Sequence, residues 1–269
     1  MRPELPRENV FGHTKKALLV LSALARLRGE RQRGIQVLDV GCGNGTALTR
    51  FLTYPGDTVI GIDTHEPSIA YARSHFGAPG MEFHAASIES LAADGRRFDV
   101  VVFADVLEHV PEPEFLLSSG VQLLRERGRA LITVPNGFGP FEIESWLSRL
   151  PAFGPASLWA VDRLVAVLNR FAFKGAWNEV VVPVDVPYNA ECGHVRFFTQ
   201  GALLRTASGA GLTLVRRVGL SWLSGPYTNY FLAPSRWFCA MNTRVADRLP
   251  FCMLSGWFFE LARLREEAS

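Results

Sequence analysis

The chain has 269 residues and a formal net charge of +2 at pH 7, so its overall charge gives no argument for nucleic acid as a partner. Hydrophobic residues make up 48% of the sequence, which allows a substantial core, but no uncharged apolar stretch reaches the ~18 residues of a membrane-spanning helix. The four cysteines form no C-x-x-C pair, so neither a zinc site nor a disulfide framework is predicted. Without a visible signal peptide, we expect a cytoplasmic protein.

The N-terminal part, residues 1–34, is predicted to be a loose arm followed by a helix over 14–28. Alanine and leucine recur on one side of that helix, and Thr14 is a candidate cap. A buried strand is expected over 36–40, and a helix over 46–52 follows it.

The turn between this strand and helix carries glycine at alternate positions, Gly41, Gly43 and Gly45. Such a turn brings bare backbone N–H groups close to a ligand and aims the positive end of the helix dipole at it. The dinucleotide pattern G-x-G-x-x-G places its third glycine one residue later, which weakens a nicotinamide interpretation. A tight turn that binds nothing is the alternative at this point.

A second strand, 58–62, ends on Asp63, which lies 18 residues after Gly45. An acid at about this spacing binds the ribose hydroxyls in Rossmann-type sites. The alternative is that Asp63 only caps the helix predicted over 67–76.

Further strands are predicted over 81–85, 98–103 and 129–134, with a helix over 115–125. Alternating strands and helices from 36 to 134 predict an α/β fold with a doubly wound parallel sheet. Ligands of such sheets bind at the carboxyl ends of the strands, which here include those after 40, 62 and 103.

Three segments in this order, VLDVGCGNG, VIGID and FDVVVFADVLEHVPEP, resemble class I S-adenosylmethionine-dependent methyltransferases. The sequence is most similar to the bacterial type with an LEHV motif, which includes ubiquinone-biosynthesis O-methyltransferases and methyltransferases of polysaccharide and natural-product clusters. The resemblance is strong over 37–134 and weaker over 194–219. It implies a Rossmann-like sheet of seven strands whose last strand is hairpinned antiparallel. It implies S-adenosyl-L-methionine as cofactor but does not specify the acceptor.

The resemblance also assigns residues to the cofactor. The glycine loop would line the methionine end, the acid of the second strand would hold the ribose, and Ser87 and Ile88 would meet the adenine. Ser87 stands where the family commonly has an Asp that bonds the adenine amino group, so the charge-assisted contact is missing here. The implied cofactor-binding residues are Asp39, Gly41, Cys42, Gly43, Gly45, Asp63, Thr64, Ser87, Ile88, Ala104 and Asp105.

Two histidines are candidate catalytic bases, because a histidine titrates near neutrality. His109 is the third residue of the LEHV motif, and His194 begins the segment HVRFFT, which resembles the part that rejoins the core in the same methyltransferases. Structural roles are the alternative for both.

Other side chains receive weaker assignments. Glu108, His109, Glu142, Glu144 and His194 can in principle ligate a metal, but their spacing is not diagnostic and no metal is predicted. In the resembling family a leading helix covers the cofactor, so His13 and Lys16 could approach the site. We favour a solvated, basic helix start for these two residues.

The core, 35–137, is followed by an aromatic-rich insert, 138–193, with a helix over 156–171 and an edge strand or extended lid over 180–188. We interpret the insert, which contains Trp146, Trp159 and Trp177, as a cap on the acceptor side; a small satellite core is the alternative.

The rest of the core, 194–233, is predicted to contain a helix over 200–210, strand six over 212–218 and strand seven over 227–232. An apolar helical tail, 234–269, follows, with its helix over 249–264. This tail could contact a membrane surface or a second copy as an amphipathic helix, or simply be core.

The predicted function is transfer of a methyl group from S-adenosyl-L-methionine to a small molecule, most simply to a hydroxyl oxygen of an aromatic, quinone-like or sugar compound. The first alternative is a non-catalytic regulatory or scaffold protein that binds the cofactor. A nicotinamide-dependent oxidoreductase is disfavoured by the glycine spacing. A nucleic-acid methyltransferase lacks support, because there is no basic stripe with interleaved aromatic residues.

Overall fold

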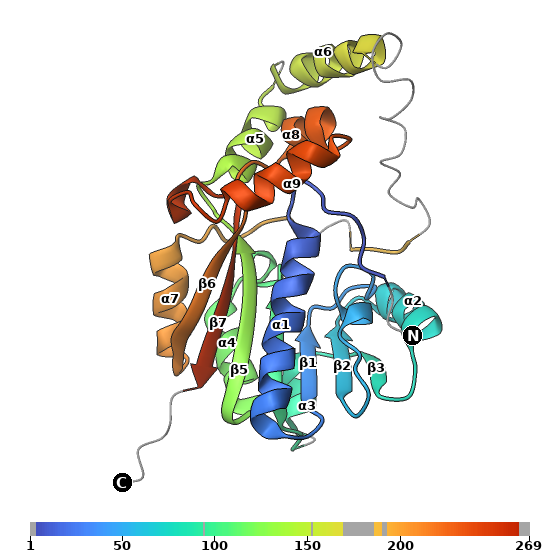
Figure 1. The fold of residues 1–269 in the computed structure, drawn as a ribbon, viewed down its shortest axis with the longest axis vertical. Helices are drawn as coiled ribbons and strands as arrows, with labels where there is room; N and C mark the ends of the chain where they lie inside the picture. Colours follow the sequence, from blue (N-terminus) through green and yellow to red (C-terminus); the bar gives the residue numbers. More distant parts are fainter. Residues whose placement is uncertain (1–3, 94, 152, 169–185, 190–192, 264–269) are drawn as a thin grey trace.

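The computed structural model describes residues 4–93, 95–151, 153–168, 186–189 and 193–263. Strands in these ranges form a seven-stranded sheet in the order β3-β2-β1-β4-β5-β7-β6 (Figure 1). The strands are β1 Gln36–Val40, β2 Thr58–Asp63, β3 Met81–Ala85, β4 Phe98–Ala104, β5 Leu124–Pro135, β6 Leu212–Ser221 and β7 Gly256–Arg263. The first five are parallel, and β7 is antiparallel to both of its neighbours. The predicted doubly wound sheet with an antiparallel final strand is confirmed.

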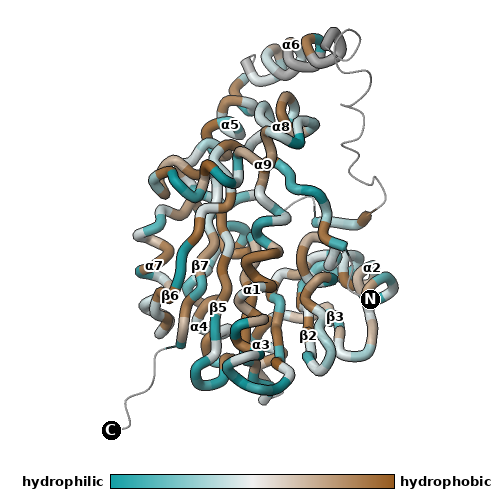
Figure 2. Tube along the Cα trace, viewed as in Figure 1, coloured by the Kyte–Doolittle hydropathy of each residue, from teal (hydrophilic) through white to brown (hydrophobic). Residues whose placement is uncertain are grey.

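Helices cover both faces of this sheet, because the strands are apolar on both sides. Val37, Val59 and Val100 pack with the helices α1 and α2, whereas Leu38 and Ile60, one residue further along, pack with α3, α4 and α7. Figure 2 shows the hydrophobic residues concentrated in the strands and in α1. The helices are α1 His13–Arg31, α2 Glu66–Phe76, α3 Ile88–Ala93, α4 Pro113–Leu123, α5 Pro140–Arg149, α6 Phe153–Leu168, α7 Gln200–Gly209, α8 Pro226–Leu232 and α9 Arg236–Val245.

The prediction of a C-terminal helix over 249–264 is wrong. Phe251–Met253 forms a single 3₁₀ turn, and Gly256–Arg263 forms β7 inside the sheet. The apolar residues that suggested a helix here belong in part to a strand covered on both sides, with Trp257, Phe258 and Phe259 all buried. The described residues of this segment form no such helix, and the predicted membrane or dimer contact of the tail, 234–269, stays a prediction. Residues 264–269 lie outside the described residues.

Two further predicted elements differ from the structure. Residues 227–232, predicted as strand seven, belong to α8, which begins with Pro226 in the first turn after Gly225. The helix predicted over 46–52 is reduced to one 3₁₀ turn, Thr49–Phe51, whose Thr49 hydroxyl donates a hydrogen bond to Asp39 Oδ2 at 2.6 Å. That bond ties the segment to β1.

Four helices, α5, α6, α8 and α9, lie beyond the carboxyl end of the sheet (Figure 1). Of these, α5, α6 and α8 contact one another. The helix predicted over 156–171 is present as α6, whereas its last residues, Trp177 and most of the predicted lid over 180–188 fall outside the described residues. The division of the chain into core and insert stays a prediction. Within the described ranges, none of the helices has the length and apolar character needed to cross a bilayer.

Candidate functional site

Two adjoining pockets lie at the carboxyl edge of the sheet, and both are lined by Asp105 and His109. The first, which we call the glycine-loop pocket, has a volume of about 420 Å³. The second, the histidine pocket, has a volume of about 150 Å³. The glycine-loop pocket is lined by residues that include Gly41, Asp63, Thr64, Ser87, Ile88, Val106, Leu116 and Asn189. The histidine pocket is lined by residues that include Phe11, His13, Lys16, Glu108, Phe141, His194, Ser221, Ser224 and Ser255.

The predicted cofactor residues divide into two groups. Those in the lining of the glycine-loop pocket are Gly41, Asp63, Thr64, Ser87, Ile88 and Asp105. The others, which lie behind this lining or beside it, are Asp39, Cys42, Gly43, Gly45 and Ala104. Cys42 packs on β2, where a Cβ added at Gly61 would lie 2.9 Å from its Sγ, and burial raises the pKa of its thiol.

The glycine loop requires glycine for its backbone. Gly41, Gly43 and Gly45 have φ values of 70°, 55° and 76°, a region that other residues rarely adopt. A Cβ at Gly41 would also lie 2.5 Å from Cγ2 of Val106, in the segment after β4. The loop therefore closely approaches the segment after β4, and Gly41 lines the pocket. The expectation of bare N–H groups is wrong, because those of Gly41 and Cys42 donate to the Ile62 carbonyl and that of Gly45 to the Cys42 carbonyl.

Asp63, at the end of β2, holds the loop in place. Its Oδ2 accepts a hydrogen bond from the Gly43 backbone at 2.9 Å, and its Oδ1 accepts one from His65 at 2.8 Å. The cap position of α2 is occupied by His65, without a side-chain cap, so Asp63 is not the cap of that helix. Asp63 lines the pocket while it orders the loop.

The described part of the predicted lid lies against the glycine loop. The Pro187 carbonyl accepts hydrogen bonds from Asn44 Nδ2 at 2.9 Å and from Ser68 Oγ at 3.2 Å. Asn189, two residues further on, lines the glycine-loop pocket. This short segment thus covers part of the pocket.

Asp39 lies behind the loop and is buried. One of its oxygens accepts the Thr49 hydroxyl, and the other, Oδ1, has no hydrogen-bond partner among the described residues. Burial raises the pKa of Asp39 to about 7, even though the Thr49 bond and Lys16 lower it. A buried carboxylate oxygen without a partner is costly, so this one fits a nearby cationic group.

Asp105 is held in a left-handed backbone conformation, with φ at 53°. Its Oδ1 accepts the Thr133 hydroxyl at 2.6 Å, and its Oδ2 accepts Lys16 Nζ at 2.5 Å. Burial would raise the pKa of Asp105, but the charge and hydrogen bond of Lys16, with the Thr133 bond, hold it at about 2. The carboxylate between the two pockets is therefore ionised at neutral pH.

The interpretation of His13 and Lys16 as a solvated helix start is wrong. The Lys16 residue is 4% exposed, and both side chains line the histidine pocket. Thr14 is not the cap of α1 either, because that position is taken by Gly12 and the Thr14 hydroxyl donates to the Pro6 carbonyl. The sequence did contain a signal: Lys16 lies beside Ala17 and four residues before Val20, on the buried side of α1.

His13 is neutral in this site. Burial, followed by the positive charge of Lys16, lowers its pKa to about 4. Its Nδ1 lies 3.0 Å from Asn9 Nδ2, which can only donate, so Nδ1 accepts and Nε2 carries the proton. His13 also stacks on Phe11, with ring centroids 5.6 Å apart.

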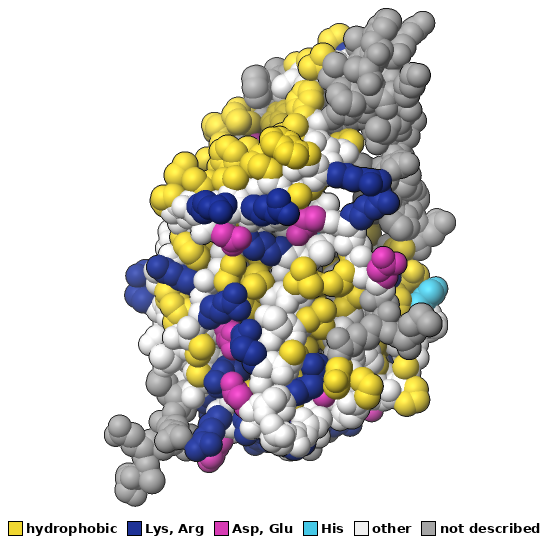
Figure 3. All heavy atoms as spheres, in the orientation of Figure 1, with side chains coloured by type: hydrophobic (Ala, Val, Ile, Leu, Met, Phe, Trp, Pro, Cys, Tyr) yellow, Lys and Arg dark blue, Asp and Glu magenta, His cyan; other side chains and the backbone are white. Residues whose placement is uncertain are grey.

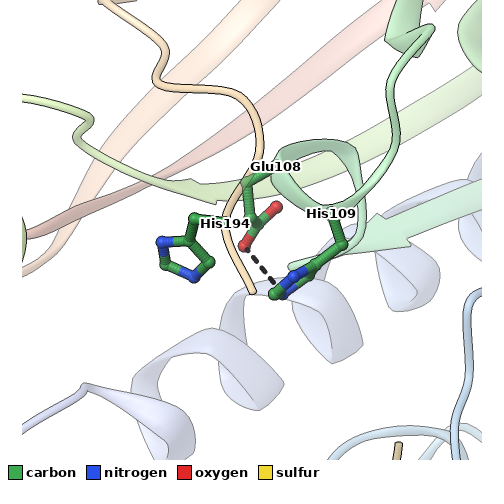
Figure 4. A group of neighbouring side chains, drawn as sticks. All are labelled: Glu108, His109 and His194. Carbon is green, nitrogen blue, oxygen red and sulfur yellow. Dashed lines mark ion pairs between the residues drawn. The ribbon is translucent and has the colours of Figure 1, made fainter. Parts of the chain in front are cut away.

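The two candidate catalytic histidines come together with Glu108, from residues more than 80 positions apart in the chain (Figure 4). The rings of His109 and His194 are 4.9 Å apart, and His109 Nε2 is 3.9 Å from Glu108 Oε1. The Glu108 carbonyl accepts the backbone N–H groups of Val195 and Arg196, which ties the two segments together.

Each histidine is oriented through its Nδ1 atom. Nδ1 of His194 lies 2.6 Å from Glu142 Oε1, and Nδ1 of His109 lies 3.2 Å from the Gly193 carbonyl. With Nδ1 donating, Nε2 of a neutral ring is an acceptor. Both rings can thus take a proton inside the histidine pocket.

Glu108 is 1% exposed, and its Oε2 has no hydrogen-bond partner in the described part of the chain. Burial, strengthened by the negative charge of Asp105, raises the pKa of Glu108 well above its usual value. Ligand atoms of Glu108, His109 and His194 lie within 4.8 Å of one another, close enough to surround a metal ion. Of the other candidate metal ligands, Glu142 orients His194, and Glu144 binds Thr228 of α8 instead.

Several lining residues were missed by the sequence interpretation. Phe11 and Phe141 place two aromatic rings, 6.4 Å apart at their centroids, beside the histidines. Three buried serines, Ser221, Ser224 and Ser255, come from the ends of β6 and β7 and the loop before α8. These residues belong to no motif, and only the sheet order brings them together.

Comparisons with known proteins identify relatives of this chain. A family model described as a methyltransferase domain matches residues 11–217. A ubiquinone biosynthesis O-methyltransferase of Rhizobium rhizogenes is 35% identical over 105 residues, which cover 38% of this chain and 42% of that protein. A ubiquinone biosynthesis O-methyltransferase of Aromatoleum aromaticum is 37% identical over 106 residues, which cover 38% of this chain and 45% of that protein. The match thus spans less than half the length of these relatives.

Solved structures with a similar fold cover nearly the whole chain. Magnesium protoporphyrin IX methyltransferase from Synechocystis, with S-adenosylhomocysteine bound, has a TM-score of 0.51 and 16% identity, over 94% of this chain and 83% of that one. An S-adenosylmethionine-dependent methyltransferase from Mesorhizobium loti has a TM-score of 0.54 and 16% identity, over 92% of this chain and 98% of that one. The chain therefore belongs to the methyltransferase domain family, and its predicted identity as a class I S-adenosylmethionine-dependent methyltransferase is confirmed.

Proposed function

We propose that the protein transfers a methyl group from S-adenosyl-L-methionine to a hydroxyl oxygen of a small acceptor with an aromatic or quinone-like ring. The observation that carries this proposal is the pair of adjoining pockets that share Asp105 and His109. One contains the residues expected at a cofactor, and the other contains aromatic rings and candidate bases. Donor and acceptor held in this way can meet in line.

The glycine-loop pocket fits the cofactor. Asp63 would hold the ribose hydroxyls, and Ser87 and Ile88 would meet the adenine; all three line this pocket. The buried, unpartnered Oδ1 of Asp39, two residues before Gly41, would suit the ammonium of the methionine moiety. When bound, the cofactor supplies a methyl group that its sulfonium has already activated.

The residues of the histidine pocket would orient the acceptor and take its proton. An aromatic acceptor fits against Phe11 and Phe141, and the serine hydroxyls offer hydrogen bonds to its substituents. As the oxygen attacks, its proton moves to Nε2 of His194 or His109. For His194, the imidazolium that forms is stabilised by Glu142 at its other nitrogen.

The relatives named as ubiquinone biosynthesis O-methyltransferases support an oxygen of a ring compound as the acceptor atom. A sugar acceptor, which can also stack on aromatic faces, is the remaining alternative for the substrate class. If the protein only bound the cofactor and did not catalyse a reaction, the histidine pocket would have no ligand. Turnover with any acceptor decides between enzyme and binding protein.

The cluster of Glu108, His109 and His194 has a second interpretation, because two imidazoles and a carboxylate can bind a divalent metal ion. Dialysis against a chelator separates the two roles. A general base predicts an unchanged rate after dialysis. A metal-binding cluster predicts a lost rate that returns on adding one divalent ion but not on adding monovalent salt.

Replacement of Asp63 tests the cofactor site. In calorimetric titrations, we expect Asp63→Ala to weaken binding of S-adenosylmethionine and S-adenosylhomocysteine by about 10- to 100-fold, the usual effect of losing charged hydrogen bonds. The variant loses the ribose acceptor and also releases the Gly43 N–H that shapes the loop. The neighbouring exposed acid offers a matched control, Glu66→Gln, which should bind both ligands like the wild type. Equal affinities in the wild type and Asp63→Ala would contradict the assigned site.

A further inference from the structure

The helices beyond the carboxyl end of the sheet expose an unusual set of large apolar side chains. Trp237 of α9 is 75% exposed and Trp146 of α5 is 61% exposed. We call the outer side of these helices the cap surface; its exposed apolar residues are Ile143, Trp146, Trp159, Tyr230 and Trp237. Figure 3 shows hydrophobic side chains gathered over this end of the molecule. Large exposed apolar patches mark interaction sites, whereas single exposed apolar residues are normal on a protein surface.

Basic side chains border the same surface. Arg236, Arg244 and Arg248 are exposed on or just after α9, and none makes an ion pair within the described ranges. The exposed acid between them, Asp247, is paired with Lys15 at 2.7 Å. Figure 3 shows a row of basic side chains next to the hydrophobic ones on this face.

The acids of α5 do not offset this charge at the surface, because they are used in the interior. Glu142 contacts His194, and Glu144 accepts hydrogen bonds from the backbone and hydroxyl of Thr228. Trp237 and Arg244 are seven residues apart, so they share one side of α9, and Arg248 follows in the turn after the helix. That side is apolar at one end and cationic at the other.

We propose that the cap surface docks on an anionic lipid bilayer. Tryptophan and tyrosine prefer the boundary between headgroups and acyl chains, where an apolar ring and a polar edge are both satisfied. Arginines beside these rings would reach lipid phosphates, to which they are attracted. A symmetric contact with a second copy would bury the same unpaired arginines without supplying an acid to pair with them, which disfavours that occupant.

The cap surface lies next to the histidine pocket, in which the acceptor is proposed to bind. α5 contributes Phe141 to the histidine pocket and Ile143 and Trp146 to the cap surface. The bilayer would therefore sit one helix away from the bound acceptor, and an acceptor with an apolar tail could keep the tail in the lipid; this consequence rests on the proposed function. The docking itself needs neither cofactor nor acceptor.

Vesicle binding of the full chain tests the proposal. Co-sedimentation is measured with vesicles of phosphatidylcholine alone and of phosphatidylcholine mixed with phosphatidylglycerol. We expect binding to the mixed vesicles that weakens with salt, and little binding to the neutral ones. The triple variant R236Q/R244Q/R248Q should bind the mixed vesicles about 100-fold less tightly, at roughly fivefold per arginine. Trp237→Ala should bind both kinds of vesicle less tightly.

A matched triple variant, R96Q/R97Q/R127Q, removes three exposed arginines from the opposite edge of the sheet and should bind vesicles like the wild type. Thermal unfolding and calorimetry with S-adenosylmethionine show that each variant is folded and keeps its cofactor site. The proposal is overturned if the wild type binds neither vesicle, or if both triple variants lose affinity equally. A dimer in sedimentation velocity that Trp237→Ala converts to monomer, without vesicle binding, would assign the surface to a second copy instead.

Discussion

Replacing Asp105 with asparagine is expected to lower the free energy of unfolding by about 3 kcal/mol, because the buried ammonium of Lys16 loses its counter-ion. Lys16 contacts Asp105 Oδ2 at 2.5 Å, and its side chain is 5% exposed. Without the carboxylate, the ammonium has no counter-ion at that contact and little access to water. Urea unfolding of the wild type and Asp105→Asn at pH 7 measures the loss.

The adjacent residue of α1 provides the control. Lys15 pairs with Asp247 at 2.7 Å, but Asp247 is 52% exposed, so Asp247→Asn should cost less than about 1 kcal/mol. Lys16→Met should cost about 2 kcal/mol, since the Asp105 side chain is 39% exposed to the pocket and keeps its Thr133 bond. Similar losses for Asp105→Asn and Asp247→Asn would show that the burial of Lys16 has no energetic role.

The lowered pKa of Asp105 also predicts how the difference in free energy of unfolding between the wild type and Asp105→Asn depends on pH. Folding holds this pKa at about 2, below the value of about 3.9 for an unfolded chain. A group with a depressed folded-state pKa contributes stability that is complete above the unfolded value. The destabilisation caused by Asp105→Asn should therefore be constant at neutral pH and shrink only as the pH falls from about 4 towards 2.

The sequence predicted the central sheet well because its strands are continuous apolar runs separated by turn residues. β1, β2 and β4 could be recognised without tertiary information, and their order along the rim follows from the handedness of the crossovers. β7 could not be recognised in this way. Its apolar residues, Trp257 to Phe259 and Leu261, are equally suited to a buried helix, and only pairing with both β5 and β6 makes it a strand.

In the candidate site, too, residues within a sequence motif could be predicted, whereas contacts between residues far apart in the sequence could not. Asp63 and the glycine loop were found because a motif and its spacing specify them. Lys16 was misjudged because its role depends on Asp105, which lies 89 residues away in the sequence. The contact between His109 and His194 was likewise invisible, although each residue was a candidate on its own. The role of a residue within a motif can be predicted from one sequence. The partner of a charged residue outside any motif can be identified only once the fold is known.

The largest effect on catalysis is expected from the histidines. His194→Ala should lower kcat by about 10²- to 10⁴-fold at saturating acceptor, the usual contribution of a general base. His194 lines the histidine pocket and not the glycine-loop pocket, so calorimetry should find the affinity for S-adenosylmethionine unchanged. His109 lines both pockets, and His109→Ala should reduce both kcat and cofactor affinity.

Two variants separate base chemistry from a merely structural role of His194. Glu142→Gln keeps the imidazole in place but removes the charge that stabilises its protonated form, so kcat should fall by about tenfold or more while the acceptor KM changes little. The control is His84→Ala, an exposed histidine on β3 that pairs with Glu82 and should leave kcat unchanged. If Glu142→Gln and His194→Ala both turn over like the wild type while His109→Ala does not, the proton moves to His109. If all of these variants keep the wild-type kcat, neither histidine is the base, and the acceptor reaches the donor as an oxygen that has already lost its proton.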